Sequence, residues 1–217
     1  MIKILFLVTV CSIVLMSCMG SSSGTISHDQ ARRDSLRAKR SADSLRFASL
    51  LAKAEYPLIK GGKWSGIIPV TDPTEIPDPN HEYKLLFEFT ARNPDSLSKE
   101  INQSLDEVIR VLNLHVASGI PKNKITPVVL IHGPGIEAVT NDETYKKKHS
   151  IDNPNIKFVR ELENAGTKFI VCGQAMAFQN TTKDQLLPEI KVSLTAQTVL
   201  SNYQSQGYVR YSIDPDK

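Results

Sequence analysis

From residue 83 to the C-terminus, short apolar segments alternate with longer segments whose apolar residues recur every three or four positions. Short apolar runs bounded by turn-forming residues are typical of buried strands, and the three-or-four spacing is typical of amphipathic helices. The predicted strands are residues 84–90, 126–132, 168–172, 189–193 and 208–213. The predicted helices are residues 96–118, 143–148, 155–165, a helix from Gln174, and residues 195–206.

This alternation of strands and helices predicts an α/β fold. Consecutive strands joined by helices run parallel, and right-handed crossovers tend to place successive strands side by side. A sheet whose strands are apolar on both faces needs helices on both sides. We therefore expect residues 83–217 to form a three-layer α/β/α domain with a five-stranded parallel sheet.

Two segments of different character precede this domain. Residues 27–54 contain neither proline nor glycine and place mostly small residues at helical spacing, which predicts a helix with a thin apolar stripe. We interpret residues 18–54 as a polar linker and a helical stalk that packs loosely or pairs with other copies. Residues 55–82 contain five prolines, which favours an extended strap lying across the domain surface.

Residues 1–17 have the pattern of an export signal. One lysine precedes a run over residues 4–16 that is apolar at all but three positions, a length that suits a signal peptide and is short for a bilayer span. The following Leu15-Met16-Ser17-Cys18 resembles the lipobox of bacterial lipoproteins. That resemblance implies cleavage before Cys18, lipid on Cys18, and a protein anchored in the cell envelope on a periplasmic or outer-membrane face. The alternative is an ordinary cleaved signal with an incidental Cys18.

The charge distribution argues against a nucleic-acid-binding domain. The formal net charge is +3, but residues 18–53 hold seven basic and three acidic residues, whereas residues 54–217 hold 18 basic and 20 acidic residues. A nucleic-acid groove needs clustered positive charge. We therefore expect no nucleic-acid partner for the slightly acidic main body.

Cys172 is the candidate reactive residue. The chain has three cysteines; Cys11 would leave with the signal and Cys18 would carry lipid, so Cys172 is the thiol that remains. It ends a predicted strand just before a predicted helix, where the helix dipole and the amides of Gly173 and Gln174 favour the thiolate. The alternative is that Cys172 packs as a small buried hydrophobe.

A second candidate loop, His132-Gly133-Pro134-Gly135-Ile136-Glu137-Ala138, follows the strand over residues 126–132. It contains GxGxxA, but Pro134 removes one amide from a phosphate cradle and no acidic residue ends the next strand, so we do not expect dinucleotide binding. The amides of Gly133 and Gly135, together with His132, can instead hold a small anion. The alternative is that these glycines only shape the turn and that His132 is hydrogen-bonded at the strand end.

If consecutive strands pair, His132 and Cys172 lie on one rim of the sheet, at the carboxyl ends of the strands, where open α/β sheets bind ligands. A thiol and an imidazole within reach of each other suit nucleophilic chemistry, with His132 as the proton partner. No third group that would orient His132 is recognisable, which does not favour a cysteine hydrolase. The five histidines show no metal-ligand spacing, so we expect neither a metal nor another cofactor.

The ordered succession of these segments resembles the DsrE/DsrF-like family, which includes small sulfur-relay proteins. The resemblance covers residues 83–213 and rests on VVLIHGPGIEAV, NPNIKFVRELENAGTKFIVCGQAM and SLTAQTVLSNYQSQGYVRYSI in this order. The exported, Bacteroidetes-type members with a lipobox and a proline-rich lead-in look most similar. The resemblance implies a five-stranded parallel sheet, trimers or hexamers, and a cysteine after the third strand that carries sulfur as a persulfide. Cys172 stands at that position.

We therefore expect a DsrE-like envelope lipoprotein that binds or relays sulfane sulfur through a persulfide on Cys172, with His132 as proton partner. The partners implied are the membrane, further copies of the chain, and a protein that donates or accepts sulfur. The alternative is a non-catalytic oligomeric binding module of the same fold.

Overall fold

The computed structural model describes residues 28–213. Contacts divide the chain into two compact units, residues 1–46 and residues 47–217. Helix α1 (His28–Leu51) has 24 residues and confirms the predicted helix before the domain. Within residues 28–213 no helix is both long enough and apolar enough to cross a bilayer. The predicted signal peptide and the lipidation site at Cys18 lie outside the described residues.

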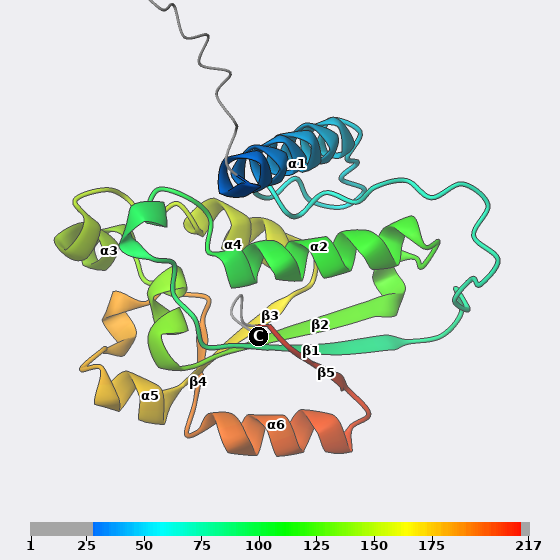
Figure 1. Cartoon of the computed structure of the whole chain (residues 1–217). Coiled ribbons are helices and arrows are strands. Elements are labelled where there is room, and N and C mark those ends of the chain that lie inside the picture. The colour runs from blue at the N-terminus through cyan, green and yellow to red at the C-terminus, as the bar shows by residue number, and fades with distance from the viewer. Residues whose placement is uncertain (1–27, 214–217) are drawn as a thin grey trace, which may run out of the picture. The chain divides into compact units, whose positions relative to one another are not determined.

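The core of the domain is a five-stranded, all-parallel sheet with the strand order β4-β3-β2-β1-β5, which confirms the predicted fold class (Figure 1). Successive strands from β1 to β4 are neighbours, and the last strand crosses back to pair with β1. The strands are β1 (Tyr83–Phe89), β2 (Ile125–Ile131), β3 (Lys168–Cys172), β4 (Lys191–Ser193) and β5 (Val209–Ser212).

Helices cover both faces of this sheet. Figure 1 shows α2 and α4 over one face and α6 over the other, with α5 beyond the end of β3. The α-helices are α2 (Gln103–Ala117), α3 (Asp142–His149), α4 (Ile156–Asn164), α5 (Gly173–Phe178) and α6 (Ala196–Ser205). Short 3₁₀ helices occupy Asp95–Leu97, Lys122–Lys124, Gly133–Val139 and Lys183–Gln185.

The predicted helix over residues 96–118 begins later than its apolar pattern indicates. Asn102 caps α2, because its side-chain oxygen accepts hydrogen bonds from the amides of Ser104 and Leu105. The residues before the cap form a separate 3₁₀ turn at Asp95–Leu97. The capping chemistry of Asn102, rather than the apolar periodicity, therefore sets the start of α2.

The sheet divides the hydrophobic interior into two cores. Alternate residues of each strand point to opposite faces, so one set packs against α2 and α4 and the other against α6. The smaller core, between the sheet and α6, contains Leu86, Val128, Leu130, Ile170, Cys172, Ala196, Val199 and Tyr203. Each fully buried aliphatic or aromatic side chain stabilises the fold by about 1.5–3 kcal/mol.

The strap over residues 55–82 is pinned to α2 by two buried polar side chains. Asn113 accepts hydrogen bonds from the amides of Leu58 and Ile59 and donates to the carbonyls of Ile59 and Ser65. Asp106 accepts from the amides of Gly62, at 2.7 Å, and Trp64, at 2.9 Å. Every hydrogen-bonding position of Asn113 is thus filled by the strap.

The close approach of the strap explains its Gly61-Gly62 pair. A Cβ atom added to Gly61 would lie 2.7 Å from Oδ1 of Asp106, and one added to Gly62 would lie 2.5 Å from a methyl group of Ile101. Trp64 is 48% exposed and lies against the ring of Phe47. The apolar anchors of the strap are instead Ile59 and Ile67, which are both buried.

Candidate functional site

A pocket of about 750 Å³ opens at the carboxyl end of the sheet, on the face covered by α6. This is the end at which open α/β sheets bind ligands, and the volume is within the range of about 300–1,000 Å³ usual for small-molecule sites. The residues that line it are Glu88, His132, Gly133, Pro134, Cys172, Gln174, Ala175, Phe178, Gln179, Thr195, Ala196, Gln197 and Leu200. Both Cys172 and His132 are among them, so the structure brings the two predicted residues to one cavity.

Cys172 lies at the inner wall of the pocket and is 5% exposed. It ends β3, and its Sγ atom accepts a hydrogen bond of 3.2 Å from the backbone amide of Ala196, the first residue of α6. The first amides of a helix have no partner within the helix and lie at the positive end of its dipole. The sulfur of Cys172 thus meets the N-terminus of α6 at the wall of the pocket.

The amide donor to the sulfur differs from the one predicted. Gly173 and Gln174 open α5, which has only six residues, and the Gln174 amide donates to the carbonyl of Leu194 instead. Gly173 packs against β4, since a Cβ atom there would lie 2.7 Å from the Ser193 carbonyl oxygen. Cys172 faces α6 rather than α5 because the alternation of β3 turns its side chain to the α6 face.

His132 is held by a carboxylate that the sequence reasoning missed. Nε2 of His132 lies 2.9 Å from Oε1 of Glu88, and Oε2 of Glu88 accepts from Nε of Arg210 at 2.5 Å. Glu88 is 7% exposed and its carboxylate is shielded from water, whereas the Arg210 side chain is 42% exposed. Because a carboxylate accepts hydrogen bonds, Nε2 donates in this contact, and in a neutral imidazole Nδ1 is then the atom with the lone pair.

The strand pattern explains why these three side chains converge. Glu88, His132 and Cys172 stand at or just beyond the carboxyl ends of three adjacent strands, and Ile131 pairs with Val171 in the sheet. Each of the three lies two positions beyond a residue whose side chain is buried between the sheet and α6. Because side chains alternate along a strand, each therefore points to the face covered by α6. Those three buried residues are Leu86, Leu130 and Ile170.

Glu88 had a signal in the sequence. It is the one acidic residue in β1, YKLLFEF, whose residues from Leu85 onward are all buried. A buried carboxylate is costly unless it is paired, so an isolated acidic residue in an apolar strand indicates partners at the strand end. The partner Arg210 comes from β5, which is last in the sequence but next to β1 in the sheet, and this long-range pairing was not visible in the sequence.

The two glycines of the loop after β2 have different surroundings. Gly133 lines the pocket, has a positive φ of 55°, and its carbonyl accepts from Nε2 of Gln179. Gly135, a predicted ligand-binding residue, packs against β1 instead: its amide donates to the Thr90 carbonyl, and a Cβ atom would lie 2.9 Å from the Phe89 ring. The close approach of this loop to β1 therefore takes the Gly135 amide away from any ligand.

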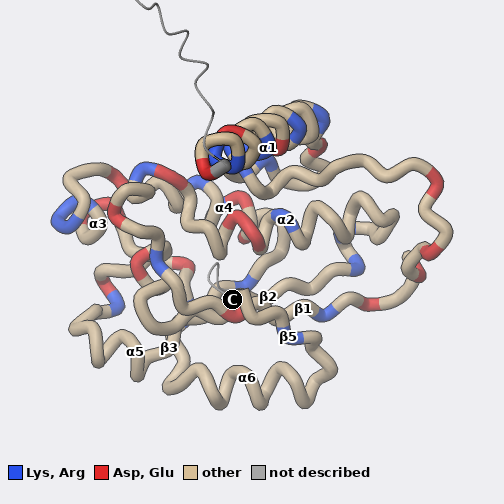
Figure 2. Tube along the Cα trace, viewed as in Figure 1, with Lys and Arg blue, Asp and Glu red and all other residues tan. Residues whose placement is uncertain are grey.

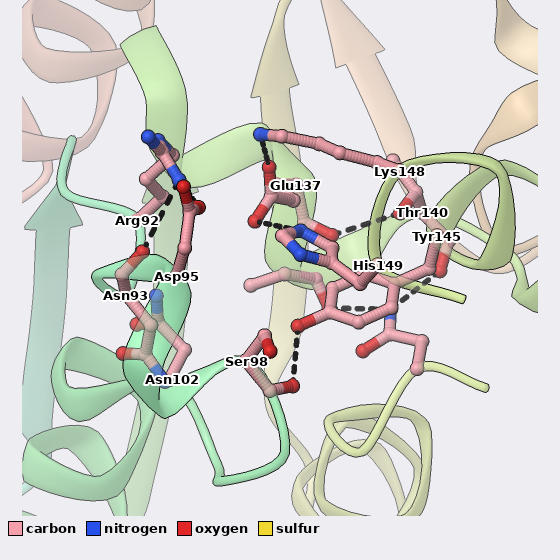
Figure 3. A network of polar contacts seen from close by, with 12 residues as sticks. Arg92, Asn93, Asp95, Ser98, Asn102, Glu137, Thr140, Tyr145, Lys148 and His149 are labelled. Carbon is pink, nitrogen blue, oxygen red and sulfur yellow. Dashed lines mark hydrogen bonds and ion pairs between the residues drawn. The ribbon is translucent and has the colours of Figure 1, made fainter. Parts of the chain in front are cut away.

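A second polar cluster lies on the other face of the sheet, in the loops after β1 and β2 (Figure 3). Nε2 of His149 lies 2.9 Å from Glu137, which also pairs with Lys148, and the Tyr145 hydroxyl donates to the Ser98 carbonyl. Burial, with a smaller effect of the Glu137 charge, raises the pKa of Tyr145 to about 12. These groups satisfy one another and fasten α3 to the loop before α2, which indicates a structural role.

A further cavity of about 630 Å³ lies at the opposite, amino end of the sheet. Its wall includes Lys60, Lys122 and Lys157, with no cysteine or histidine. Within residues 28–213 no group of three or more histidine, cysteine, aspartate or glutamate side chains is arranged to hold a metal ion. The chemistry of the described part of the chain is therefore concentrated in the pocket at Cys172.

The fold and the pocket define a class of protein: an α/β domain with an all-parallel sheet and, at its carboxyl end, a pocket lined by a thiol and an imidazole. The model of the DsrE/DsrF-like family matches residues 92–209, more than half of the chain, and the chain belongs to this family. Among solved structures, a protein of unknown function from Methanobacterium thermoautotrophicum is similar, with 18% sequence identity and a TM-score of 0.45. The similarity covers 60% of this chain and 99% of that chain. No curated protein matches the sequence.

Proposed function

We propose that this protein accepts and passes on sulfane sulfur as a persulfide on Cys172. The observation that carries the proposal is the position of Sγ, which faces a pocket, receives the Ala196 amide and shares the cavity with His132. A thiol in this setting has the two things that sulfur transfer needs: a stabilised thiolate and a nearby group that can move a proton. Membership of the DsrE/DsrF-like family supports the same chemistry.

The transfer step needs no external oxidant. The Cys172 thiolate attacks the terminal sulfur of a donor R–S–S–H, a new S–S bond joins Cys172 to that sulfur, and the donor's S–S bond breaks with R–S⁻ leaving. His132 takes the thiol proton before the attack, directly or through one water, and returns it to R–S⁻. The products are the Cys172 persulfide and R–SH, so protons and electrons balance.

Glu88 and Arg210 are positioning residues for His132. The carboxylate fixes the tautomer and the orientation of the imidazole, and the guanidinium fixes the carboxylate. These two side chains together hold the His132 ring so that Nδ1 is the proton acceptor.

The proposal is tested by incubating the protein with inorganic polysulfide and weighing the intact chain under non-reducing conditions. One added sulfur is expected on the wild type and none on Cys172→Ser. His132→Gln should keep the site of addition but slow it by about 100-fold or more, since a proton-transfer partner usually contributes about 10²–10⁴-fold. No added sulfur on the wild type, or equal addition to Cys172→Ser, contradicts the proposal.

One observation favours a second candidate, a binding module without sulfur chemistry. Cys172 packs within the apolar core below α6 together with Ile170, Ala196 and Val199, as an unreactive cysteine does. On this alternative, iodoacetamide alkylates Cys172 no faster than it alkylates free cysteine at neutral pH. The persulfide proposal expects faster alkylation.

The proposal includes an envelope location and an oligomer, as the lipobox resemblance and the family resemblance imply. A lipid on Cys18 would place the domain at a membrane surface, and several acyl chains hold a protein there durably. Incorporation of labelled palmitate into the wild type but not into Cys18→Ser tests the anchor. Light scattering of the purified protein tests for a trimer or hexamer; a strict monomer would remove the oligomer from the proposal.

A further inference from the structure

We infer that the sulfur donor for this pocket is a low-molecular-weight persulfide with an apolar body, not a cysteine displayed on the surface of a folded partner protein. The inference rests on the proposed function, because it names the substrate class for Cys172. It opposes the protein-to-protein relay that the family resemblance implies.

The first argument is the depth of the sulfur. Cys172 is 5% exposed, and α6 closes over it so that the Ala196 amide meets Sγ at 3.2 Å. Transfer requires the donor sulfur to come within about 3–3.5 Å of Sγ in line with the breaking bond. A cysteine side chain is short, so a folded donor would have to bring its backbone into the pocket. A small persulfide only has to enter it.

The second argument is the apolar part of the pocket wall. Ala175, Phe178 and Leu200 line the pocket, and Phe178 is 89% exposed, so its ring is free to cover the body of a bound molecule. An aromatic ring left almost wholly in water loses nothing on covering a ligand and gains the burial of its own apolar surface. The wall therefore favours a donor whose group R is apolar.

The third argument is charge. Among the lining residues there is no lysine or arginine, and Glu88 contributes a carboxylate. The charge of Arg210 is matched by Glu88, and α6 carries no charged residue, as Figure 2 shows. An oxyanion donor such as thiosulfate would therefore find no unpaired lysine or arginine among the lining residues to offset its charge. A persulfide with a neutral body needs no such cation.

The experiment compares four donors on the full chain, each followed by the rate at which Cys172 gains sulfur in intact-mass spectra. The donors are benzyl persulfide released from a stable precursor, inorganic disulfide, thiosulfate, and a folded protein carrying a surface cysteine persulfide. Benzyl persulfide should load Cys172 about 100-fold faster than the folded protein persulfide at equal concentration, because only the small donor reaches the near-attack distance. Thiosulfate should be the slowest small donor.

Phe178→Ala isolates the apolar wall. It should slow loading by benzyl persulfide about tenfold and leave loading by inorganic disulfide unchanged, since the latter has no body for the ring to cover. The matched control is Ile76→Ala, which removes an exposed apolar side chain from the strap and should change neither rate. Phe178 is exposed, so its truncation is not expected to unfold the domain.

The outcomes separate this inference from the proposed function. Fast loading by the folded protein persulfide, or an equal effect of Phe178→Ala on both small donors, overturns the inference and leaves the persulfide on Cys172 standing. Failure of every donor to load Cys172 overturns the proposed function itself.

Discussion

The sulfur of Cys172 accepts a hydrogen bond from the amide of Ala196, and this contact distinguishes a reactive cysteine from one that only packs. A cysteine that only packs needs no such donor, whereas a thiolate is stabilised by it. Ala196 is the first residue of α6, and Thr195 before it has an extended backbone with φ −152° and ψ 150°. Both positions suit a test by proline, which is tolerated at the first position of a helix and requires an extended residue before it.

Ala196→Pro should slow the alkylation of Cys172 at neutral pH. The substitution replaces the amide hydrogen that meets Sγ by the ring carbon Cδ, so the sulfur loses its donor and shifts away from N, while the hydrogen bonds within α6 stay intact. Loss of about 1 kcal/mol of hydrogen bonding to the thiolate corresponds to about a fivefold slower reaction. The rate is measured with iodoacetamide, and Cys172→Ser shows which part of the signal is specific. An unchanged rate in a variant whose melting temperature is also unchanged would show that the amide does not activate the thiol.

Glu88→Gln should slow sulfur loading of Cys172 about tenfold while the protein stays folded, as is typical when a residue that orients a reacting histidine is changed. The glutamine keeps the volume of Glu88 but removes the charge that pairs with Arg210 and fixes His132. The pH dependence of loading should change as well, which a purely structural role would not produce. Glu107→Gln, which breaks the ion pair with Arg110 on α2, is the matched control and should load at the wild-type rate.

Glu163 on α4 gives a prediction for stability. Burial, and next the charge of Glu189, raise its pKa from 4.5 to about 6. The folded state therefore binds this proton more tightly than the unfolded state, so its contribution to stability is present below pH 4.5 and is lost as the pH rises through about 6. After discounting for solvent screening, Glu163→Gln should stabilise the protein by about 1 kcal/mol at neutral pH.

Urea unfolding at about pH 4 and at neutral pH measures this difference. At the acid pH the wild type and Glu163→Gln should have the same free energy of unfolding, because Glu163 is then protonated in both states of the wild type. An equal difference at both pH values would mean that the substitution acts through packing rather than through the charge.

At the scale of the elements, the strap and α2 behave as one structural unit. Asn113 is fully buried in the middle of α2 and exchanges four hydrogen bonds with strap backbone groups. Asp106, on the same face of α2, accepts two further hydrogen bonds from strap amides. Burial raises the pKa of its carboxyl group. The strap thus covers α2 through polar contacts as well as through Ile59 and Ile67.

Asn113→Ala should therefore lower the free energy of unfolding by about 3 kcal/mol, since it leaves several backbone groups of the strap without partners in a buried setting. It should also expose residues 58–65 to limited proteolysis. Asn202→Ala on the exposed surface of α6 is the control and should change stability by no more than about 0.5 kcal/mol. Strap residues that stay protected in Asn113→Ala would contradict the pinning by α2.

At the scale of the whole molecule, the sheet could be predicted from the sequence. The hydrophobic periodicity identifies the strands and helices, and their alternation along the chain predicts a parallel α/β topology. The segments around KFIVC and TPVVLI are apolar on both faces, and consecutive strands are neighbours from β1 to β4. His132 and Cys172 were placed on one rim by the same argument, and both line the pocket.

The parts of the site that depend on contacts distant in sequence could not be predicted. The donor to Cys172 is Ala196, 24 residues later, and the partner of Glu88 is Arg210, 122 residues later. The local sequence predicted the amides of Gly173 and Gln174 as donors to the sulfur, because a thiol at a strand end is expected to face the next helix. The side-chain alternation of β3 instead turns Cys172 toward α6. The helix whose N-terminus meets the sulfur is therefore determined by the packing of the helices on the sheet.

The most direct test of the central claim is a competition for limiting persulfide. The protein and an equal concentration of free cysteine are mixed with less than one equivalent of low-molecular-weight persulfide, and the peptide that contains Cys172 is weighed after rapid alkylation. Because Sγ is held by the Ala196 amide in a pocket shared with His132, the sulfur should be found on Cys172 well ahead of free cysteine. Sulfur divided evenly between the two thiols, or found only on free cysteine, would contradict the account.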